Sequence, residues 1–250
     1  MTPHYMLIQS AHADSKLSAR RLAISKTTVI PALASQTSKP IVALMVHVDD
    51  PILTERIEAF RSTGCELHIV EIAGEFRLCG NDWRLPDGRK VISRVDDDDS
   101  LCKEFCETIY AAAEGKDETC LLWPKGYVFW RDNLFILDHP RNQFPTLVTS
   151  SQQTPHDMPH VWYHDNWKCL TVTTKPGWIW IRHGIAMSST RKKYRPKRVG
   201  RIEADRFAIN LRAAGRAIEP CGVPSASYAE HRAMRAERGI EYIDMIPLGL

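Results

Sequence analysis

The chain has 250 residues, of which 44% are hydrophobic and 25% are charged, and its formal net charge is +3. This composition is typical of a globular protein of one large or two small domains, and no apolar run approaches the roughly 20 residues of a membrane-spanning helix. The seven cysteines lack zinc-type pairing, and the N-terminal residues lack the features of a signal peptide. The sequence therefore predicts a cytoplasmic protein with reduced thiols and no membrane span.

The first 72 residues alternate between strand-like and helix-like patterns. Residues 40–48 form a continuous apolar run, which is typical of a strand buried on both faces of a parallel sheet. Pro31 is expected to kink the first helix. The alternation indicates βαβ units. The predicted elements are strands at 5–11, 40–48 and 65–72 and helices at 18–36 and 51–60.

Four consecutive carboxylates, Asp96 to Asp99, follow the β-branched run Val91–Val95. Adjacent acids repel one another, and a hard divalent cation with oxygen ligands is a natural counter-charge. Ligand sites in open α/β sheets lie at the carboxyl ends of strands. The pattern at 100–114 predicts a helix, with the acids at its N-terminus. An acidic turn that only caps this helix is the alternative interpretation.

The pattern changes after Thr119 to short aromatic strands separated by turn residues, which indicates antiparallel pairing. The strand at 177–184 ends in Arg182-His183-Gly184. Residues 182–201 contain eight Lys or Arg and no acid. The predicted strands of this region lie at 120–124, 127–130, 134–137, 146–149, 168–174 and 177–184.

These features together resemble GT-A-fold glycosyltransferases, and among them the rhamnosyltransferase family of bacteria and phages. The resemblance rests on the helix segment 28–37 with its Gln36-Thr37 end, on the run Arg94-x-Asp-Asp-Asp-Asp, and on the late His183-Gly184. It covers roughly residues 5–190. It implies an α/β fold that is GT-A-like, with a Rossmann-type half and a mostly parallel central sheet, then a mixed or antiparallel aromatic β region. Residues 191–250 would form a basic helical extension packed on the 1–190 domain.

The resemblance also implies a nucleotide-sugar donor held by Mn²⁺ or Mg²⁺. Side chains alternate along a strand, so Asp96 and Asp98 are expected to face the metal, with the pair Asp98 and Asp99 as the alternative. Asp97 and Asp99 would face the other way unless the chain turns, and Asp97 remains a further donor-binding candidate. Arg94 shares the face of the metal pair, where it would bind the donor or form an ion pair with a neighbouring Asp.

The late basic segment supplies further candidates. His183 is expected to complete the metal shell, since imidazole is an acceptable ligand for Mn²⁺. The cations expected to bind the donor diphosphate are Arg182, Arg191, Lys192 and Lys193. An inverting enzyme needs a base. Asp165 is the first candidate and His164 the second, although Asp165-Asn166 also reads as a simple turn.

The acceptor and even the class of protein stay open in the sequence. A glycan or other small hydroxyl compound is the first hypothesis for the acceptor. Hydroxymethylated DNA of the phage type is the alternative, because the basic segment with Tyr194 suits a phosphate backbone. A non-catalytic nucleic-acid-binding protein is the second alternative. A metal-dependent nuclease is disfavoured, because the acids lie in a single run.

Overall fold

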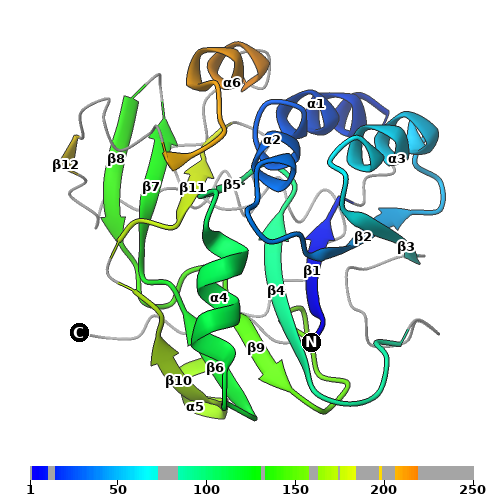
Figure 1. The fold of residues 1–250 in the computed structure, drawn as a ribbon. Coiled ribbons are helices and arrows are strands. Elements are labelled where there is room, and N and C mark those ends of the chain that lie inside the picture. The colour runs from blue at the N-terminus through cyan, green and yellow to red at the C-terminus, as the bar shows by residue number, and fades with distance from the viewer. Residues whose placement is uncertain are drawn as a thin grey trace.

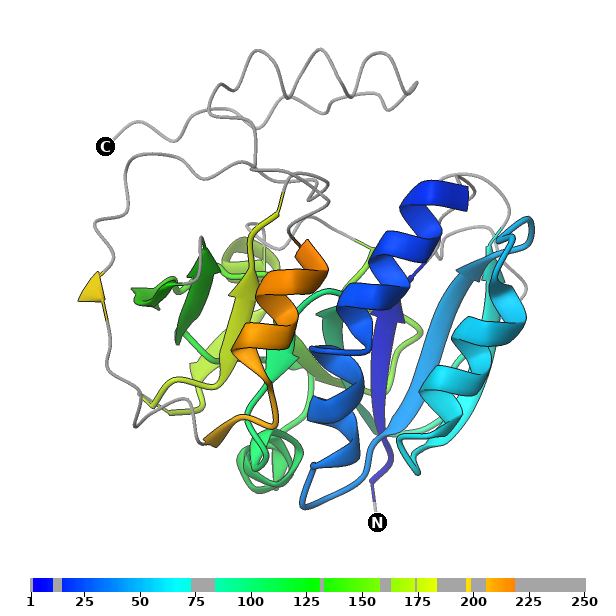
Figure 2. The ribbon, with the colours of Figure 1, turned by 90° about the horizontal axis from the view of Figure 1, so that it is seen from above.

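The computed structural model describes residues 2–10, 15–72, 84–130, 133–157, 163–173, 175–183, 197–198 and 206–218. These residues form two β-sheets with helices packed on them (Figure 1). Seen from above, α1, α2 and α3 lie along one side of the parallel strands (Figure 2). No helix in this described part is long and apolar enough to cross a membrane.

The first sheet has seven strands in the order β10-β6-β9-β4-β1-β2-β3. Strands β1 to β4 are mutually parallel, and β10 is parallel to β6. Only β9 runs against its neighbours in this sheet, antiparallel to both β4 and β6. The predicted α/β fold with a mostly parallel central sheet is therefore confirmed. The strands are β1 (His4–Gln9), β2 (Ile41–His47), β3 (Glu66–Ile72), β4 (Lys90–Asp96), β6 (Thr119–Leu122), β9 (Thr146–Thr149) and β10 (Lys168–Thr171).

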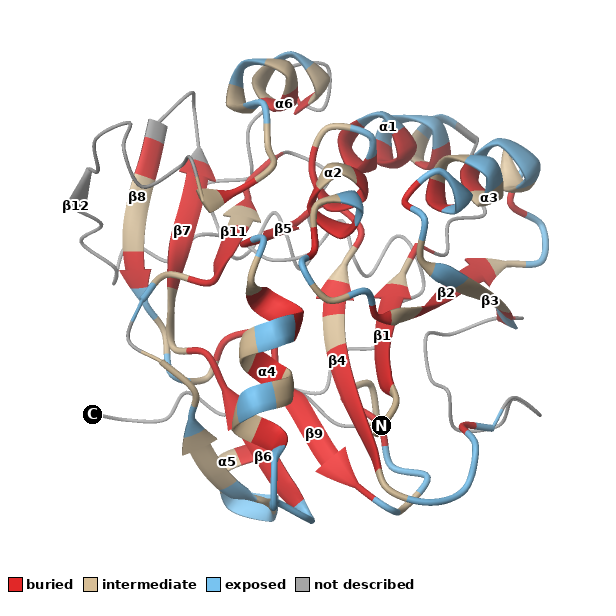
Figure 3. Ribbon diagram, viewed as in Figure 1, coloured by how far each residue is buried: buried red, intermediate tan, exposed pale blue. Residues whose placement is uncertain are grey.

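The centre of this sheet is buried on both faces, as the apolar runs predicted (Figure 3). Ile8 of β1 lies opposite Leu44 of β2 on one side and Val95 of β4 on the other, and all three are fully buried. The chain runs from β1 outward to β3 and then returns to place β4 on the other side of β1. This reversal of strand order is where open α/β sheets bind ligands, at the carboxyl ends of the strands.

Six helices lie in the described part of the chain and accompany the sheets. The predicted helix 18–36 is two helices, α1 and α2, and the break lies at residues 26–28 instead of at Pro31. Pro31 is the third residue of α2, in the first turn, where its missing N–H breaks no helical hydrogen bond. The helices are α1 (Ser15–Ser25), α2 (Val29–Ala34), α3 (Leu53–Arg61), α4 (Phe105–Ala113), α5 (Tyr163–Asn166) and α6 (Leu211–Ile218).

The second sheet has five strands in the order β12-β8-β7-β11-β5. The hairpin of β7 and β8 is antiparallel, as predicted, whereas β11 runs parallel to β7. Strand β5 pairs with β11 directly after the acidic run, so the expected helix at 100–114 begins only at Phe105. The acids thus connect the two sheets instead of opening a helix. The strands are β5 (Ser100–Leu101), β7 (Lys125–Trp130), β8 (Asn133–Asp138), β11 (Trp178–Ile181) and β12 (Lys197–Arg198).

One described segment, residues 206–218, follows the basic stretch and contacts the rest of the chain. The Arg206 Nε donates to Glu104 at 2.7 Å, and Phe207 forms an isolated β-bridge with Cys102. Helix α6 packs against α1 (Figure 1). These contacts join the described parts of the C-terminal region to the N-terminal helices.

Candidate metal and donor site

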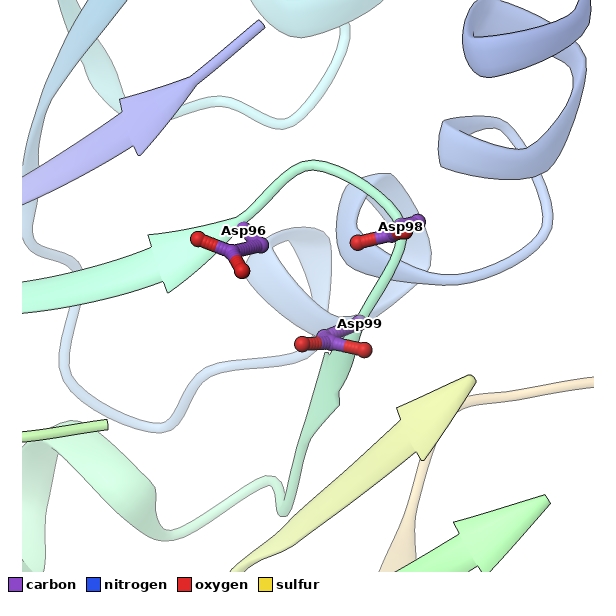
Figure 4. A group of neighbouring side chains, drawn as sticks. All are labelled: Asp96, Asp98 and Asp99. Atoms are coloured by element: carbon purple, nitrogen blue, oxygen red, sulfur yellow. The ribbon is translucent and has the colours of Figure 1, made fainter. Parts of the chain in front are cut away.

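The acidic run forms a tight turn between the two sheets. Strand β4 ends at Asp96, the Asp99 N–H donates to the Asp96 carbonyl at 3.2 Å, and β5 begins at Ser100. Strand alternation therefore stops at Asp96. The side chains of Asp96, Asp98 and Asp99 gather around this turn (Figure 4). Asp96 and Asp98 lie together as expected, but placing Asp99 on the opposite side was wrong, because the chain turns between them.

The three gathered carboxylates suit a divalent cation. One oxygen from each of Asp96, Asp98 and Asp99 lies within 4.8 Å of the other two. Ligand oxygens about 2.1 Å from a shared Mg²⁺ can be no more than about 4.2 Å apart, so a small contraction would close the set around an ion. Carboxylate oxygens are the ligands that Mg²⁺ and Mn²⁺ prefer. The three carboxylates therefore fit the Mn²⁺ or Mg²⁺ ion that the sequence implies.

Asp97 points away from this group and into the protein. Its carboxylate accepts a hydrogen bond from Ser10 Oγ at 2.5 Å and one from Arg21 Nη2, and Arg56 Nη1 lies 3.8 Å away. The side chain is completely buried. The expectation that Asp97 contacts the donor does not fit this placement, because its oxygens face Ser10, directly after β1, and arginines of α1 and α3.

Asp98 is contacted by two residues from distant parts of the chain. His183 Nε2 lies 2.8 Å from Asp98 Oδ2, and Arg21 Nη1 donates to the same oxygen. His183 follows β11, is 1% exposed and has no hydrogen-bond partner for Nδ1 among the described residues. The predicted proximity of His183 to the acids is thus present, although the imidazole contacts Asp98 and lies outside the close group of three carboxylates.

Burial and neighbouring negative charges both act to raise the pKa of the carboxyl groups at the turn. Burial raises the pKa of Asp96 despite the opposing charge of Arg94. Burial and the charges of Asp98 and Asp96 raise the pKa of Asp99 well above its usual value. Burial also acts to raise the pKa of Asp98, but Arg21 and His183 outweigh it and the net shift is downward. A bound cation would stabilise the ionised form of all three carboxylates.

Two predicted arginines flank the group. Arg94 Nη2 lies 3.3 Å from Asp96 Oδ1, which is the ion pair that the sequence left as one of two possibilities. Arg182 is almost completely buried, and its guanidinium carbon lies 4.5 Å from the centre of the Trp180 ring. Burial lowers the pKa of Arg182 to about 10, against the charges of Asp99 and Asp98, so it remains a cation at neutral pH.

Two of the remaining candidates, Asp165 and His164, do not join the site. Asp165 and His164 lie in α5, immediately before β10, and β10 runs in the same direction as β4. They are therefore at the amino-terminal edge of the sheet, whereas the acidic turn is at the carboxyl-terminal edge (Figure 1). A base role for either residue at the acidic turn does not fit this fold. Arg191, Lys192 and Lys193 lie outside the described residues.

Sequence reasoning missed several residues that hold the turn in place. Arg21 is the most informative of these, because it lies on the same helical face as Leu17 and Ile24. A charged residue on a buried helical face is a signal for an internal counter-charge, and it could have been read from the sequence. The other missed residues are Ser10, Asp50, Arg56 and Gln143.

Four of the missed residues form one connected network around Asp97, whereas Gln143 lies 3.5 Å from Asp99. Arg56 Nε donates to Asp50 at 2.7 Å and Nη1 to Ser10 at 2.8 Å, while Ser10 in turn donates to Asp97. On the other side of the turn, Asp99 accepts the Ile181 N–H at 2.9 Å. The acidic turn is therefore fixed by Ser10, which follows β1, and by residues of α1, α3 and β11.

No protein-family model matches this chain, and no curated protein matches it. Among solved structures it is similar to S. aureus TarS, with 10% identity, a TM-score of 0.46 and coverage of 72% of this chain and 37% of that one. The structure of TarS residues 1–349 is 9% identical, with a TM-score of 0.45 and coverage of 72% of this chain and 60% of that one. A nucleotide-diphospho-sugar transferase from Desulfovibrio desulfuricans G20 is 12% identical, with a TM-score of 0.36 and coverage of 72% of this chain and 82% of that one.

The chain thus spans less than two thirds of either TarS structure. With identities this low and TM-scores below 0.5, these likenesses carry no argument about activity, and they do not confirm the resemblance to rhamnosyltransferases. The function has to be argued from the site itself.

Proposed function

We propose that the protein is a metal-dependent glycosyltransferase that moves a sugar from a nucleotide-sugar donor to a hydroxyl acceptor. One observation carries the proposal: the carboxylates of Asp96, Asp98 and Asp99 gather at the carboxyl end of β4. This end lies next to the point where the strand order reverses, between β1 and β4. An acidic group at that position suits a cation that bridges the protein and a nucleotide diphosphate.

Each residue has a definite part in this proposal. Asp96, Asp98 and Asp99 would hold Mn²⁺ or Mg²⁺, which when bound supplies Lewis-acid stabilisation of the leaving diphosphate. Arg182 keeps its charge near Asp98 and Asp99 and would bind donor oxygens. His183 holds one oxygen of Asp98 and so orients it.

Donor binding can be tested with a thermal-shift panel of UDP-, GDP-, dTDP- and CMP-sugars, each with and without Mn²⁺. A ligand at one hundred times its Kd adds about 2.7 kcal/mol of stability to the folded state. We expect one nucleotide class to raise the melting temperature only with metal, and Asp96→Asn to remove that rise. Asp165→Asn is the matched control and should keep it. If no nucleotide shifts the melting temperature with any metal, the proposal is wrong.

The products distinguish glycosyl transfer from other uses of the same donor. Transfer of the sugar breaks the bond between the anomeric carbon and the diphosphate, and it releases a nucleoside diphosphate. Transfer of the nucleotidyl group would instead break the bond between the inner phosphorus and the bridging oxygen of the diphosphate, and it would release sugar 1-phosphate. Chromatography of the reaction mixture separates the two products, and sugar 1-phosphate as the product would contradict the proposal.

The acceptor remains a choice between two classes. A glycan or small hydroxyl compound is the main proposal. Hydroxymethylated DNA is the alternative, favoured by the basic residues between 182 and 201. Phosphate contacts make DNA binding fall steeply with salt, by about 10³–10⁵ between 50 and 200 mM for six to ten contacts. Activity that is insensitive to salt over this range would exclude a DNA acceptor.

A further inference from the structure

Arg21 occupies an unusual place for a charged side chain. It lies on the inner face of α1 and is 8% exposed. Its guanidinium bridges two neighbouring acids, with Nη2 on Asp97 and Nη1 on Asp98. Nη1 also lies 3.5 Å from His183 Nε2. A single cation from the N-terminal helix is therefore inserted at the acidic turn.

The two carboxylates that Arg21 contacts differ in their other partners. Asp97 is also bound by Ser10 at 2.5 Å and approached by Arg56, so it anchors Arg21 without depending on it. Asp98 belongs to the group of three carboxylates that would take a metal ion. Arg21 thus has one fixed partner and one partner that a metal would share.

A metal ion at Asp98 would meet the positive charge of Arg21 at the same carboxylate. Like charges at such separations repel strongly in a buried site. An anion that contacts both cations removes the conflict, and the diphosphate of a nucleotide is such an anion. The guanidinium also retains a buried donor, Nε, that has no hydrogen-bond partner among the described residues.

We propose that Arg21 couples the metal to the donor. It would make a divalent cation bind weakly alone and tightly together with a nucleoside diphosphate. Arg21 would then contact the diphosphate while still bound to Asp97. This inference rests on the proposed function for the placement of the metal and the diphosphate. Its consequence is that the empty enzyme would not hold a metal ion permanently, and metal and donor would arrive as a pair.

The experiment measures Mn²⁺ binding by the electron paramagnetic resonance signal of free Mn²⁺, with UDP, GDP or dTDP present or absent. No catalytic activity is needed. For the wild-type protein we expect the nucleotide to tighten Mn²⁺ binding by about tenfold or more, within the range of about 5–150-fold that is usual for coupled sites. For Arg21→Gln we expect tighter binding of Mn²⁺ alone and a coupling factor near one.

Two further variants keep the result interpretable. Arg20→Gln changes an exposed neighbour on the same helix and should leave the coupling unchanged. Arg21→Lys keeps one positive charge but cannot bridge two carboxylates, so it should show intermediate coupling, and it decides the question if Arg21→Gln does not fold.

The outcomes separate the two proposals. Equal coupling in the wild type and both Arg21 variants would overturn the role of Arg21 while leaving the transferase proposal intact. If the wild-type protein fails to bind Mn²⁺ in the presence of every nucleotide tested, the proposed function itself would be overturned.

Discussion

Replacing Asp97 by asparagine should destabilise the protein far more than the same replacement of Asp96, although the two residues are adjacent. Asp97 is completely buried and holds Ser10 and Arg21, with Arg56 nearby. Asparagine has nearly the same shape, so the change removes a charge and one acceptor oxygen without making a large cavity. The destabilisation therefore reports the electrostatic role of Asp97 directly.

The structure sets the size of the effect. Removing one partner of a buried ion pair costs about 3–5 kcal/mol, because the other charge stays buried without compensation. Arg56 keeps Asp50 at 2.7 Å and Arg21 keeps Asp98, so we expect the lower end, about 3 kcal/mol. For a chain of this size, that corresponds to a fall in melting temperature of about 6–12 °C.

Asp96 provides the matched comparison. Its side chain is 30% exposed and its described ion pair is the 3.3 Å contact with Arg94. Partly exposed pairs contribute about 0–1 kcal/mol. Asp96→Asn also removes one of the negative charges that, together with burial, raise the pKa of Asp99. We therefore expect the stability of this variant to stay within about 1 kcal/mol of the wild type.

Urea unfolding followed by tryptophan fluorescence measures both variants under identical conditions, and circular dichroism confirms that each is folded before denaturant is added. The reasoning would be refuted by equal losses of stability in the two variants, or by a larger loss in Asp96→Asn. The binding experiments should give the opposite order, since Asp96→Asn is expected to lose metal-dependent nucleotide binding.

Three other predictions concern separate features. Burial lowers the pKa of His4 to about 3, so the unfolded chain takes up a proton below pH 6.5 that the folded chain rejects. The unfolding free energy should therefore fall by about 2 kcal/mol at pH 5, and His4→Gln should flatten this pH dependence; an unchanged slope would contradict it. A methyl group at Gly126 would lie 2.0 Å from Trp178 Cδ2, so Gly126→Ala should lose about 1–3 kcal/mol or more in urea unfolding, and wild-type stability would argue against this packing. His183→Gln should weaken Mn²⁺ and Mg²⁺ binding in the presence of nucleotide equally, by about tenfold or more, if His183 only orients Asp98; a larger loss for Mn²⁺ would identify it as a ligand.

The sequence was sufficient for the parallel half of the fold because that half is governed by local burial patterns. The residues of β2 are apolar from Ile41 to Val46, since both faces of the strand are covered. The hairpin of β7 and β8 could likewise be predicted, because aromatic strands flank a short polar turn. The position of β9 between β4 and β6 could not be predicted, since the sequence of its four residues does not specify which strands they pair with.

The acidic turn shows where local rules fail. Four identical residues offer no periodicity, so nothing in the run itself indicates where the strand ends. The end is fixed by β5, whose two residues pair with β11 nearly 80 positions later in the chain. Asp99 accepts the Ile181 N–H as part of the same contact. Alternation correctly placed Asp96 and Asp98 together but could not reveal that Asp99 returns to the same side.

The position of His183 near the acidic run was predicted from the sequence, whereas no role was predicted for Arg21. His183 ends an apolar strand, where ligand-binding residues of such sheets are found. Arg21 lies within a helix, and its partner Asp98 is 77 positions away. The rule that a buried carboxylate needs a counter-charge predicts that such a cation exists. The position of Arg21 on the same helical face as Leu17 and Ile24 was the sequence signal that could have identified it.

The charges around the turn explain why a metal and an anion should be needed together. Five carboxylates, those of Asp50 and Asp96 to Asp99, are contacted or faced by four guanidinium groups, those of Arg21, Arg56, Arg94 and Arg182. Counted as fully ionised, these groups leave one excess negative charge. A divalent cation alone would reverse the sign and leave an excess positive charge next to Arg21. The diphosphate of a nucleotide-sugar restores a negative balance, so the site as a whole is better suited to a metal–diphosphate pair than to either component by itself.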